Sequence, residues 1–185
     1  FDRGGDEWAA GWILQTLHRH QPSALSALLG AAGGWFTAGS ESDLDYTPLQ
    51  QALLKERFEE ADRLTSAFLR QLAGEQAERR GYVYFSEVLS IRGLDLVTID
   101  RLWIAYSQGR FGFTVQARLL ATVNGRYDKL WPRIGWKKEG VWTRYPRAFD
   151  WSLKAPEGHM PLINQLRGVR LIDALLNHPS LVARQ

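Results

Sequence analysis

The sequence predicts a mostly helical protein, made of one domain with a short helical appendage at its N-terminus. Three observations lead to this prediction. The chain has 185 residues, which is the length of a single domain. Hydrophobic residues make up 45% of it, and in several segments they recur at helical spacing. The best strand-like run, Tyr82 to Phe85, lacks clean alternation and an evident pairing partner, so we interpret it as a buried connection or a short helix.

The composition excludes several kinds of site. The chain has no cysteine, which removes disulfides, thiolate-bound zinc, iron–sulfur clusters and cysteine nucleophiles. No run of about 18 apolar residues exists, so we expect no membrane-spanning helix. The single methionine is Met160, and we therefore expect that Phe1 marks a processed or trimmed start.

The first 42 residues are predicted to be an appendage. Trp8 to His20 has a helical pattern, and Ser23 is suited to cap a second short helix that glycines end. Residues 33–45 are rich in Gly, Ser and Asp, which predicts a linker. We place the domain boundary at about residue 43, because two helices are too little for an independent core. Residues 1–42 then form a partial helical bundle with its linker, and residues 43–185 form the core domain.

The helices of the core domain follow from start and stop signals. Thr47 and Pro48 open a helix, with Gln50 where a capping box places it. Asp95 is suited to cap another helix, and Pro161 to open the final one. A small hairpin is predicted around residues 138–140. The predicted helices of this domain cover residues 47–55, 57–73, 97–107, 114–123, 127–131 and 161–177.

The positive charge gathers in the last part of the chain. Residues 101–185 carry 14 basic and 5 acidic residues, although the whole chain has a formal net charge of only +3. Five of the eight tryptophans lie in the same part. A basic region rich in aromatic rings favours a planar or anionic partner, such as nucleic acid, a membrane surface or a flat carboxylated molecule.

The final predicted helix has two apolar sides. Leu162, Leu166, Val169, Ile172 and Leu176 form one arc, which is expected to face the core. The opposite side is also apolar, so it either packs on the rest of the domain or faces a ligand. Its glycine lets a flat molecule approach the backbone, and its arginines can hold a carboxylate. The residues of this second side and its margin are Asn164, Arg167, Gly168, Arg170, Leu171 and Leu175.

An irregular segment supplies the opposite wall. It holds many large rings interleaved with basic residues, and rings in an irregular segment cannot all be exposed without cost. Each single ring is suited to pin the loop to the helical body, whereas the cluster as a whole predicts a partly open aromatic and basic cleft. The residues predicted to form this wall are Trp136, Trp142, Arg144, Tyr145, Phe149 and Trp151.

Motifs of known catalytic sites are mostly missing from the sequence. It contains no Walker A loop, no nucleotide-binding glycine fingerprint, no H-E-x-x-H and no G-x-S-x-G. His18, His20, His159 and His178 do not form a metal-ligand pattern. His159, beside Met160, is the one candidate for a haem ligand, but we interpret it first as a loop histidine that hydrogen-bonds to the backbone.

Several motifs in a fixed order resemble one family. They are DLVTIDRLW over residues 95–103, GRFGFTVQ over 109–116, WPRIGW over 131–136, VWTRYP over 141–146, APEGHMP over 155–161 and NQLRGVR over 164–170. Over about residues 44–179 the chain resembles the "genomes uncoupled" family of oxygenic phototrophs, tetrapyrrole-binding regulators of magnesium chelatase. The appendage suggests a cyanobacterial member, and hence a cytoplasmic protein.

The resemblance implies an all-α core with a cupped surface that binds protoporphyrin IX and magnesium protoporphyrin IX, without catalytic activity, cofactor or metal site. It implies stimulation of magnesium chelatase together with its large porphyrin-binding subunit. Phe85 and Val88 would lie in the floor of the site, Tyr145 in the loop, and Arg167 and Arg170 beside the propionates. Tyr145 departs from the Trp of close relatives, and Asn164 would reach the pyrrole nitrogens or the metal.

Two other functions are open from the residues alone. An RNA or single-strand binding module would also stack bases on aromatic rings beside arginine, but the rings crowd one loop without an extended track. A haem enzyme would use His159. We expect a monomer without nucleic acid as a partner, and the exposed basic and aromatic residues permit peripheral association with a membrane.

Overall fold

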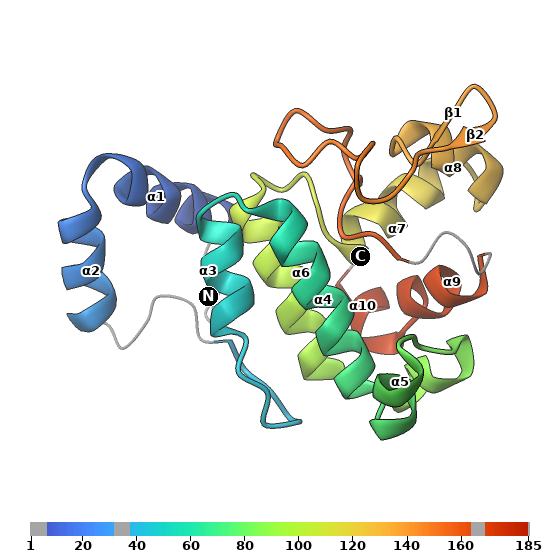
Figure 1. Ribbon diagram of the computed structural model, residues 1–185, viewed down its shortest axis with the longest axis horizontal. Helices are drawn as coiled ribbons and strands as arrows, with labels where there is room; N and C mark the ends of the chain where they lie inside the picture. The colour runs from blue at the N-terminus through green and yellow to red at the C-terminus, as the bar shows by residue number, and fades with distance from the viewer. Residues whose placement is uncertain (1–6, 32–37, 164–168, 185) are drawn as a thin grey trace.

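The computed structural model describes residues 7–31, 38–163 and 169–184, and these residues are mostly helical, as the sequence predicts (Figure 1). A two-residue antiparallel hairpin pairs Lys137 with Trp142 and Lys138 with Val141, where a hairpin is predicted. In chain order, the described elements are α1 (Glu7–His20), α2 (Pro22–Ala31), α3 (Thr47–Leu54), α4 (Phe58–Leu72), α5 (Glu75–Arg80), the 3-10 helix η1 (Phe85–Ser90), α6 (Gly93–Tyr106), α7 (Phe113–Thr122), α8 (Tyr127–Arg133), β1 (Lys137–Lys138), β2 (Val141–Trp142), α9 (Arg170–Leu176) and α10 (Pro179–Val182).

The core is centred where α4 meets α6. Apolar residues recur at helical spacing along α4, so one side of this helix is buried. The indole of Trp103 on α6 stacks on Phe58 with ring centres 6.2 Å apart, and its Nε1 donates a hydrogen bond to the Thr65 hydroxyl at 2.9 Å. These contacts fix the rotation of both helices about their axes. The face of α4 that carries Asp62, Ser66 and Arg70 is thereby turned towards a cavity.

Helix α6 begins two residues before Asp95, which was expected to cap it. Asp95 is fully buried in the first turn. Its carboxylate accepts hydrogen bonds from the hydroxyls of Ser40 at 2.5 Å, Ser42 at 2.9 Å and Tyr46 at 2.9 Å. The Asp95 carboxylate therefore accepts hydroxyls from residues 40–46 instead of N–H groups from the first turn of α6. In this way Asp95 anchors residues 40–46 to α6.

The N-terminal helix α1 packs directly on α6. Gly11 approaches so closely that a Cβ built on it would lie 1.8 Å from the carbonyl oxygen of Ala105. The buried Gln15 side chain donates to the carbonyl of Tyr106 at 2.8 Å. Figure 1 shows α1 and α2 at one end of the molecule. The division of the chain near residue 43 stays a prediction.

The structure differs from the predicted helices in two details, the cap of α3 and the presence of α5. Helix α3 has Pro48 in its first turn, as expected, but Thr47 and Gln50 form no capping box. The Gln50 amide instead donates to the Tyr106 hydroxyl at 3.0 Å, which links α3 to α6. The short helix α5 was not predicted, because its six residues are almost all polar and carry little periodicity.

The final helix is shorter than predicted. Residues 161–163 are not helical, and α9 begins at Arg170. Other elements bind the backbone of this stretch: the Gln116 amide donates to the Pro161 carbonyl at 2.9 Å, and Leu162 N donates to Asp62 Oδ1 at 2.6 Å. Backbone groups held in this way are not available for helical bonds, so Pro161 does not open a helix.

Candidate functional site

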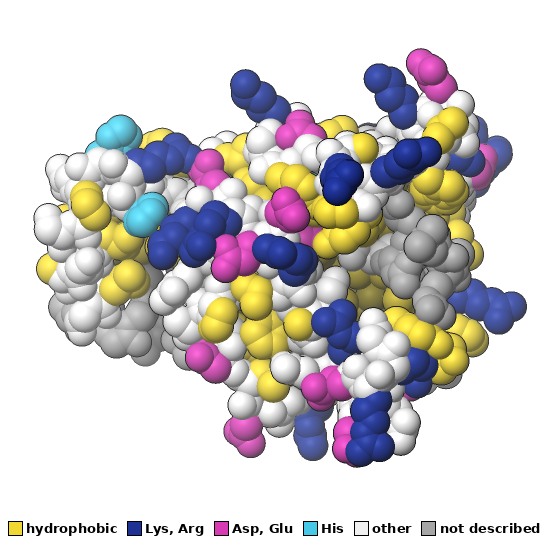
Figure 2. All heavy atoms as spheres, in the orientation of Figure 1, with side chains coloured by type: hydrophobic (Ala, Val, Ile, Leu, Met, Phe, Trp, Pro, Cys, Tyr) yellow, Lys and Arg dark blue, Asp and Glu magenta, His cyan; other side chains and the backbone are white. Residues whose placement is uncertain are grey.

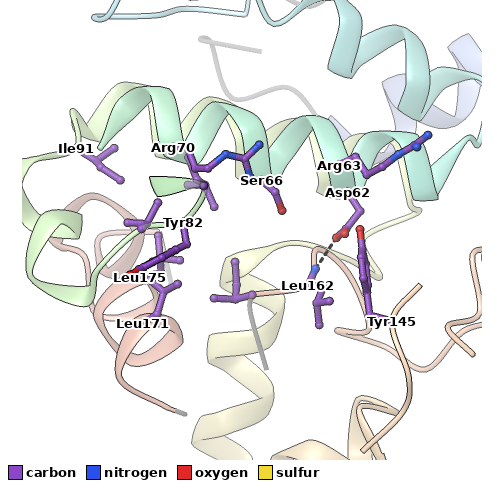
Figure 3. Close-up of a pocket in the computed structure, with 14 residues that line it drawn as sticks. Asp62, Arg63, Ser66, Arg70, Tyr82, Ile91, Tyr145, Leu162, Leu171 and Leu175 are labelled. Atoms are coloured by element: carbon purple, nitrogen blue, oxygen red, sulfur yellow. Dashed lines mark hydrogen bonds between the residues drawn. The ribbon is translucent and has the colours of Figure 1, made fainter. Parts of the chain in front are cut away.

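A cavity of about 550 Å³ lies between α4, the segment after α5, residues 162–163, α9 and Tyr145 (Figure 3). This volume is in the range of small-molecule and cofactor sites. Figure 2 shows basic side chains standing around the apolar surface on this face of the molecule. The lining residues are Asp62, Arg63, Ser66, Leu69, Arg70, Gly81, Tyr82, Val83, Ile91, Tyr145, Leu162, Ile163, Leu171 and Leu175.

The second apolar side of the final helix lies against this cavity. Leu171 and Leu175 of α9 are buried and form part of the lining, while Ile172 and Leu176 on the first side pack in the core. Both interpretations left open by the sequence therefore hold in part, because Leu171 and Leu175 pack in the core and also border the cavity. Val169, expected in the core, is 40% exposed just before α9.

Three predicted site residues meet beside the cavity. The guanidinium carbon of Arg170 lies 5.4 Å from the centre of the Phe85 ring, which is 44% exposed. Val88 lies three residues further along the same 3-10 helix and is fully buried. None of the three lines the cavity itself. Three further predicted residues lie outside the described residues: Asn164, Arg167 and Gly168.

The aromatic loop (residues 135–158) divides into two clusters. In the first, Trp136 stacks on Trp131 with ring centres 5.5 Å apart and planes at 6°, and Trp142 lies 5.7 Å from Trp131. Trp136 is 1% exposed and donates through Nε1 to the His159 carbonyl at 2.7 Å. Because the hairpin folds back on α8, Trp136 and Trp142 lie outside the cavity lining, although the sequence predicts them at the site.

The second cluster reaches the cavity through one ring. Tyr145 lies 5.8 Å from Phe149 and 5.9 Å from Trp151, and it is the member that lines the cavity. Phe149 is buried beneath it, and the Trp151 indole donates to the Pro146 carbonyl at 3.0 Å. Phe149 and Trp151 therefore support Tyr145 from behind.

Arg144 and His159 also lie outside the lining. Arg144 is exposed on the aromatic loop. His159 is buried with Nδ1 2.6 Å from the carbonyl oxygen of Ile134, which confirms the interpretation as a loop histidine bonded to the backbone. Burial lowers the pKa of His159, so the ring is neutral at pH 7. Among the described residues no cluster of three metal-ligating side chains occurs.

Sequence analysis missed the contribution of α4. Asp62, Ser66 and Arg70 recur every four residues, and together with Arg63 they form a polar stripe that lines the cavity. In the sequence, such a stripe is indistinguishable from the solvent face of an amphipathic helix. The burial of Asp62, which is 1% exposed, becomes visible only in the structure.

Asp62 sets the electrostatics at one end of the cavity. Its carboxyl accepts the Leu162 amide at 2.6 Å, and the Tyr145 hydroxyl faces it (Figure 3). Burial raises the pKa of Asp62 to about 7, against the opposing effects of the Leu162 amide and Tyr145. The pKa of Tyr145 is raised to about 12, first by its partial burial and then by the charge of Asp62.

The shape and lining of the cavity suit a large flat ligand. Its walls are mainly aliphatic, an aromatic ring stands at one end, and arginines lie on α4 and at the start of α9. Within the part of the chain that the structure describes, no helix is long and apolar enough to cross a bilayer.

Comparison with known proteins identifies the family. The sequence profile of the family described as GUN4-like matches residues 39–179. A Ycf53-like protein of Synechocystis sp. is 46% identical over 173 residues, which cover 92% of this chain and 74% of that protein. A chloroplastic protein of Arabidopsis thaliana, named tetrapyrrole-binding protein, is 38% identical over 141 residues, which cover 71% of this chain and 53% of that protein.

Solved structures agree in fold. GUN4 from Chlamydomonas reinhardtii superposes with a TM-score of 0.73 at 36% sequence identity, over 78% of this chain and 92% of that chain. Ligand-free GUN4 from Arabidopsis thaliana gives a TM-score of 0.69 at 38% identity, over 75% of this chain and 98% of that chain. The match of the family profile over most of the chain, together with these relatives and this fold, establishes that the chain belongs to the GUN4-like family.

Proposed function

We propose that this chain binds a tetrapyrrole in the cavity between α4 and α9 and has no catalytic activity of its own. The observation that carries the proposal is the cavity of about 550 Å³, with aliphatic walls and arginines at its margin. Membership in a family that includes the Arabidopsis tetrapyrrole-binding protein supports it. A tetrapyrrole is a large apolar ring with carboxylates on its rim, which matches both parts of the lining.

The magnitudes favour a ligand held between two walls. One face of a large ring buries about 200 Å², which gives roughly 5 kcal/mol at 25 cal/mol per Å². Association alone costs about 4–15 kcal/mol, so one stacked face binds weakly. Leu171 and Leu175 on α9 line one side of the cavity, α4 lines another, and Tyr145 stands at one end. Arg170 adds a charge-assisted contact for a propionate.

The finer proposals concern the ligand and its use. We propose protoporphyrin IX and magnesium protoporphyrin IX as the ligands, with Arg167 and Arg170 beside the propionates. We also propose that the chain stimulates magnesium chelatase together with its large porphyrin-binding subunit, as a monomer in the cytoplasm of a cyanobacterium. The 46% identity to the Synechocystis protein supports the cyanobacterial setting.

A titration with protoporphyrin IX tests the first proposal. The tryptophan fluorescence of the wild-type chain is expected to fall saturably at micromolar or lower ligand concentration. Ser66→Phe puts a ring into the cavity and should weaken binding at least tenfold. Gln71→Phe places the same ring on the exposed side of α4, outside the lining, and should bind as the wild type does.

The results separate the alternatives. If the wild-type chain does not bind porphyrin, the proposed function is wrong. If Ser66→Phe binds as well as Gln71→Phe, the cavity is not the site. Binding of single-stranded RNA that weakens steeply with salt, without porphyrin binding, would favour the nucleic-acid module instead.

A further inference from the structure

Asp62 is a buried carboxyl whose charge the fold does not need. It is 1% exposed in the wall of an otherwise mainly aliphatic cavity. Its Oδ1 accepts the Leu162 amide at 2.6 Å, and the neutral amide oxygen of an asparagine would also accept this bond, although more weakly. Among the described residues no cation pairs with Asp62, and a buried charge without such a partner is costly, so an ionisable group at this place points to a function beyond anchoring Leu162.

An acidic side chain lies at one end of the cavity and basic side chains lie towards the other. Asp62 and the Tyr145 hydroxyl face each other at one end (Figure 3). Arg70 lies eight residues further along α4, which corresponds to about 12 Å at 1.5 Å per residue. The wall at that end comes from α9, which Arg170 begins. Arg63 follows Asp62 directly, but it is exposed and points away from Leu162 and Tyr145 in Figure 3.

We infer that Asp62 is a specificity-determining residue, which excludes carboxylates from the Tyr145 end of the cavity. The cavity then selects tetrapyrroles that carry their carboxylates along one edge over those that carry them around the whole ring. This inference rests on the proposed function. Its physical basis is that a like charge brought near a buried carboxylate is repelled far more strongly than it would be in water.

The surroundings of Asp62 make this selectivity depend on pH. Burial raises the pKa of Asp62 to about 7, and Glu59 on the same helix acts in the same direction. Among the described residues, the neighbouring segments oppose this shift only with the Leu162 amide and the Tyr145 hydroxyl, and α9 adds the aliphatic Leu171 and Leu175 to the lining. Asp62 is therefore mostly neutral at pH 6 and mostly ionised at pH 8, so the rejection of carboxylates should grow over this interval.

Two porphyrins with different numbers of carboxylates test the inference. Deuteroporphyrin IX carries two carboxylates on one edge, whereas coproporphyrin III carries four around the ring. At pH 8 the wild-type chain should prefer deuteroporphyrin. Asp62→Asn removes the repelling carboxylate, so it should shift the ratio of the two dissociation constants by about tenfold towards coproporphyrin. Steric differences between the ligands are the same in both proteins and therefore cancel in this comparison.

Glu60→Gln is the matched control, since Glu60 lies on α4 outside the cavity lining and is not among the groups that shift the pKa of Asp62. It removes one negative charge from the same helix without touching the cavity lining, and its ratio should stay close to that of the wild type. The ratio in the wild type should itself change between pH 6 and pH 8, which tests the inference without any substitution. That change should be absent in Asp62→Asn.

The outcomes are distinct from those of the proposed function. If the wild-type chain binds neither porphyrin, the proposed function fails. If both bind, the inference is overturned by an unchanged ratio in Asp62→Asn, by an equal shift in Glu60→Gln, or by a wild-type ratio that is the same at pH 6 and pH 8.

Discussion

The guanidinium of Arg170 lies over the ring of Phe85, with 5.4 Å between the guanidinium carbon and the ring centre. The contact joins the first residue of α9 to the first residue of η1. Both residues were predicted at the site from the family resemblance, although they lie 85 positions apart in the chain, and the fold brings them together. An exposed contact of this kind contributes only about 0.5–1 kcal/mol, so it orients Arg170 more than it stabilises the protein.

Replacing Arg170 should therefore affect binding more than stability. Arg170→Ala removes a charge beside the cavity, and we expect porphyrin affinity to fall roughly tenfold, as for the loss of one charge-assisted hydrogen bond. Fluorescence titration measures the affinity, and thermal unfolding should shift by no more than a few degrees.

Arg79→Ala is the control for this variant. Arg79 is an exposed arginine on α5 that pairs with Glu75, away from the cavity lining. It should bind porphyrin with wild-type affinity. Equal affinity of Arg170→Ala and Arg79→Ala would remove Arg170 from the site.

Gly11 should be essential for the docking of α1. A Cβ at this position would overlap the Ala105 carbonyl, so Gly11→Ala must push α1 away from α6. We expect a loss of about 1–3 kcal/mol in the free energy of unfolding, measured with urea. Gly30→Ala, in α2, meets nothing within 4 Å and should be neutral or slightly stabilising. A Gly11→Ala protein as stable as Gly30→Ala would contradict this packing.

Asp62→Asn should make the ligand-free protein more stable at neutral and alkaline pH. The pKa of Asp62 is raised by burial from an ordinary 3.8 to about 7. The folded state therefore holds the proton more tightly, and this stabilising effect is complete below pH 4 and lost as the pH rises through 7. Urea unfolding of both proteins should give a difference that favours Asn at pH 8 and shrinks towards pH 4. A difference independent of pH would show that Asp62 titrates normally.

Asp95→Ala should destabilise the protein strongly. The substitution leaves the hydroxyls of Ser40, Ser42 and Tyr46 without their acceptor. An unpaired buried donor costs about 1–3 kcal/mol, and Tyr46 is buried while the two serines are half-buried, so we expect a loss of roughly 3 kcal/mol in the free energy of unfolding. Asp128→Ala, which breaks an exposed ion pair with Arg126, should change it by less than about 1 kcal/mol. Similar losses in both variants would show that Asp95 anchors nothing.

Local patterns predicted the helices well where one side is buried. The apolar positions of α4 recur at helical spacing, and the helix runs from Phe58 to Leu72, within one residue of the expected bounds. The prediction failed at Pro161, where the start signal is present but the backbone is held by Gln116 and Asp62. A start signal is local, whereas those partners lie far away in the chain.

The site was predicted only in part, because residues far away in the chain also decide which side chains reach the cavity. Tyr145 was placed at the site by its motif, and it lines the cavity. Trp136 belongs to the same loop, yet its ring is taken up by Trp131 in a stack within the core. Composition shows how many rings a loop has, but only the folded chain decides which of them are buried by a neighbour.

The sequence by itself determined the helical class, the family and the apolar second side of the last helix, because these depend on spacing and on motifs along the chain. Only the tertiary structure decided that α4 supplies the facing wall and that Asp62 stands within it. The physical reason is that burial of a charged group depends on elements up to 100 residues away, such as the segment whose Leu162 amide Asp62 binds.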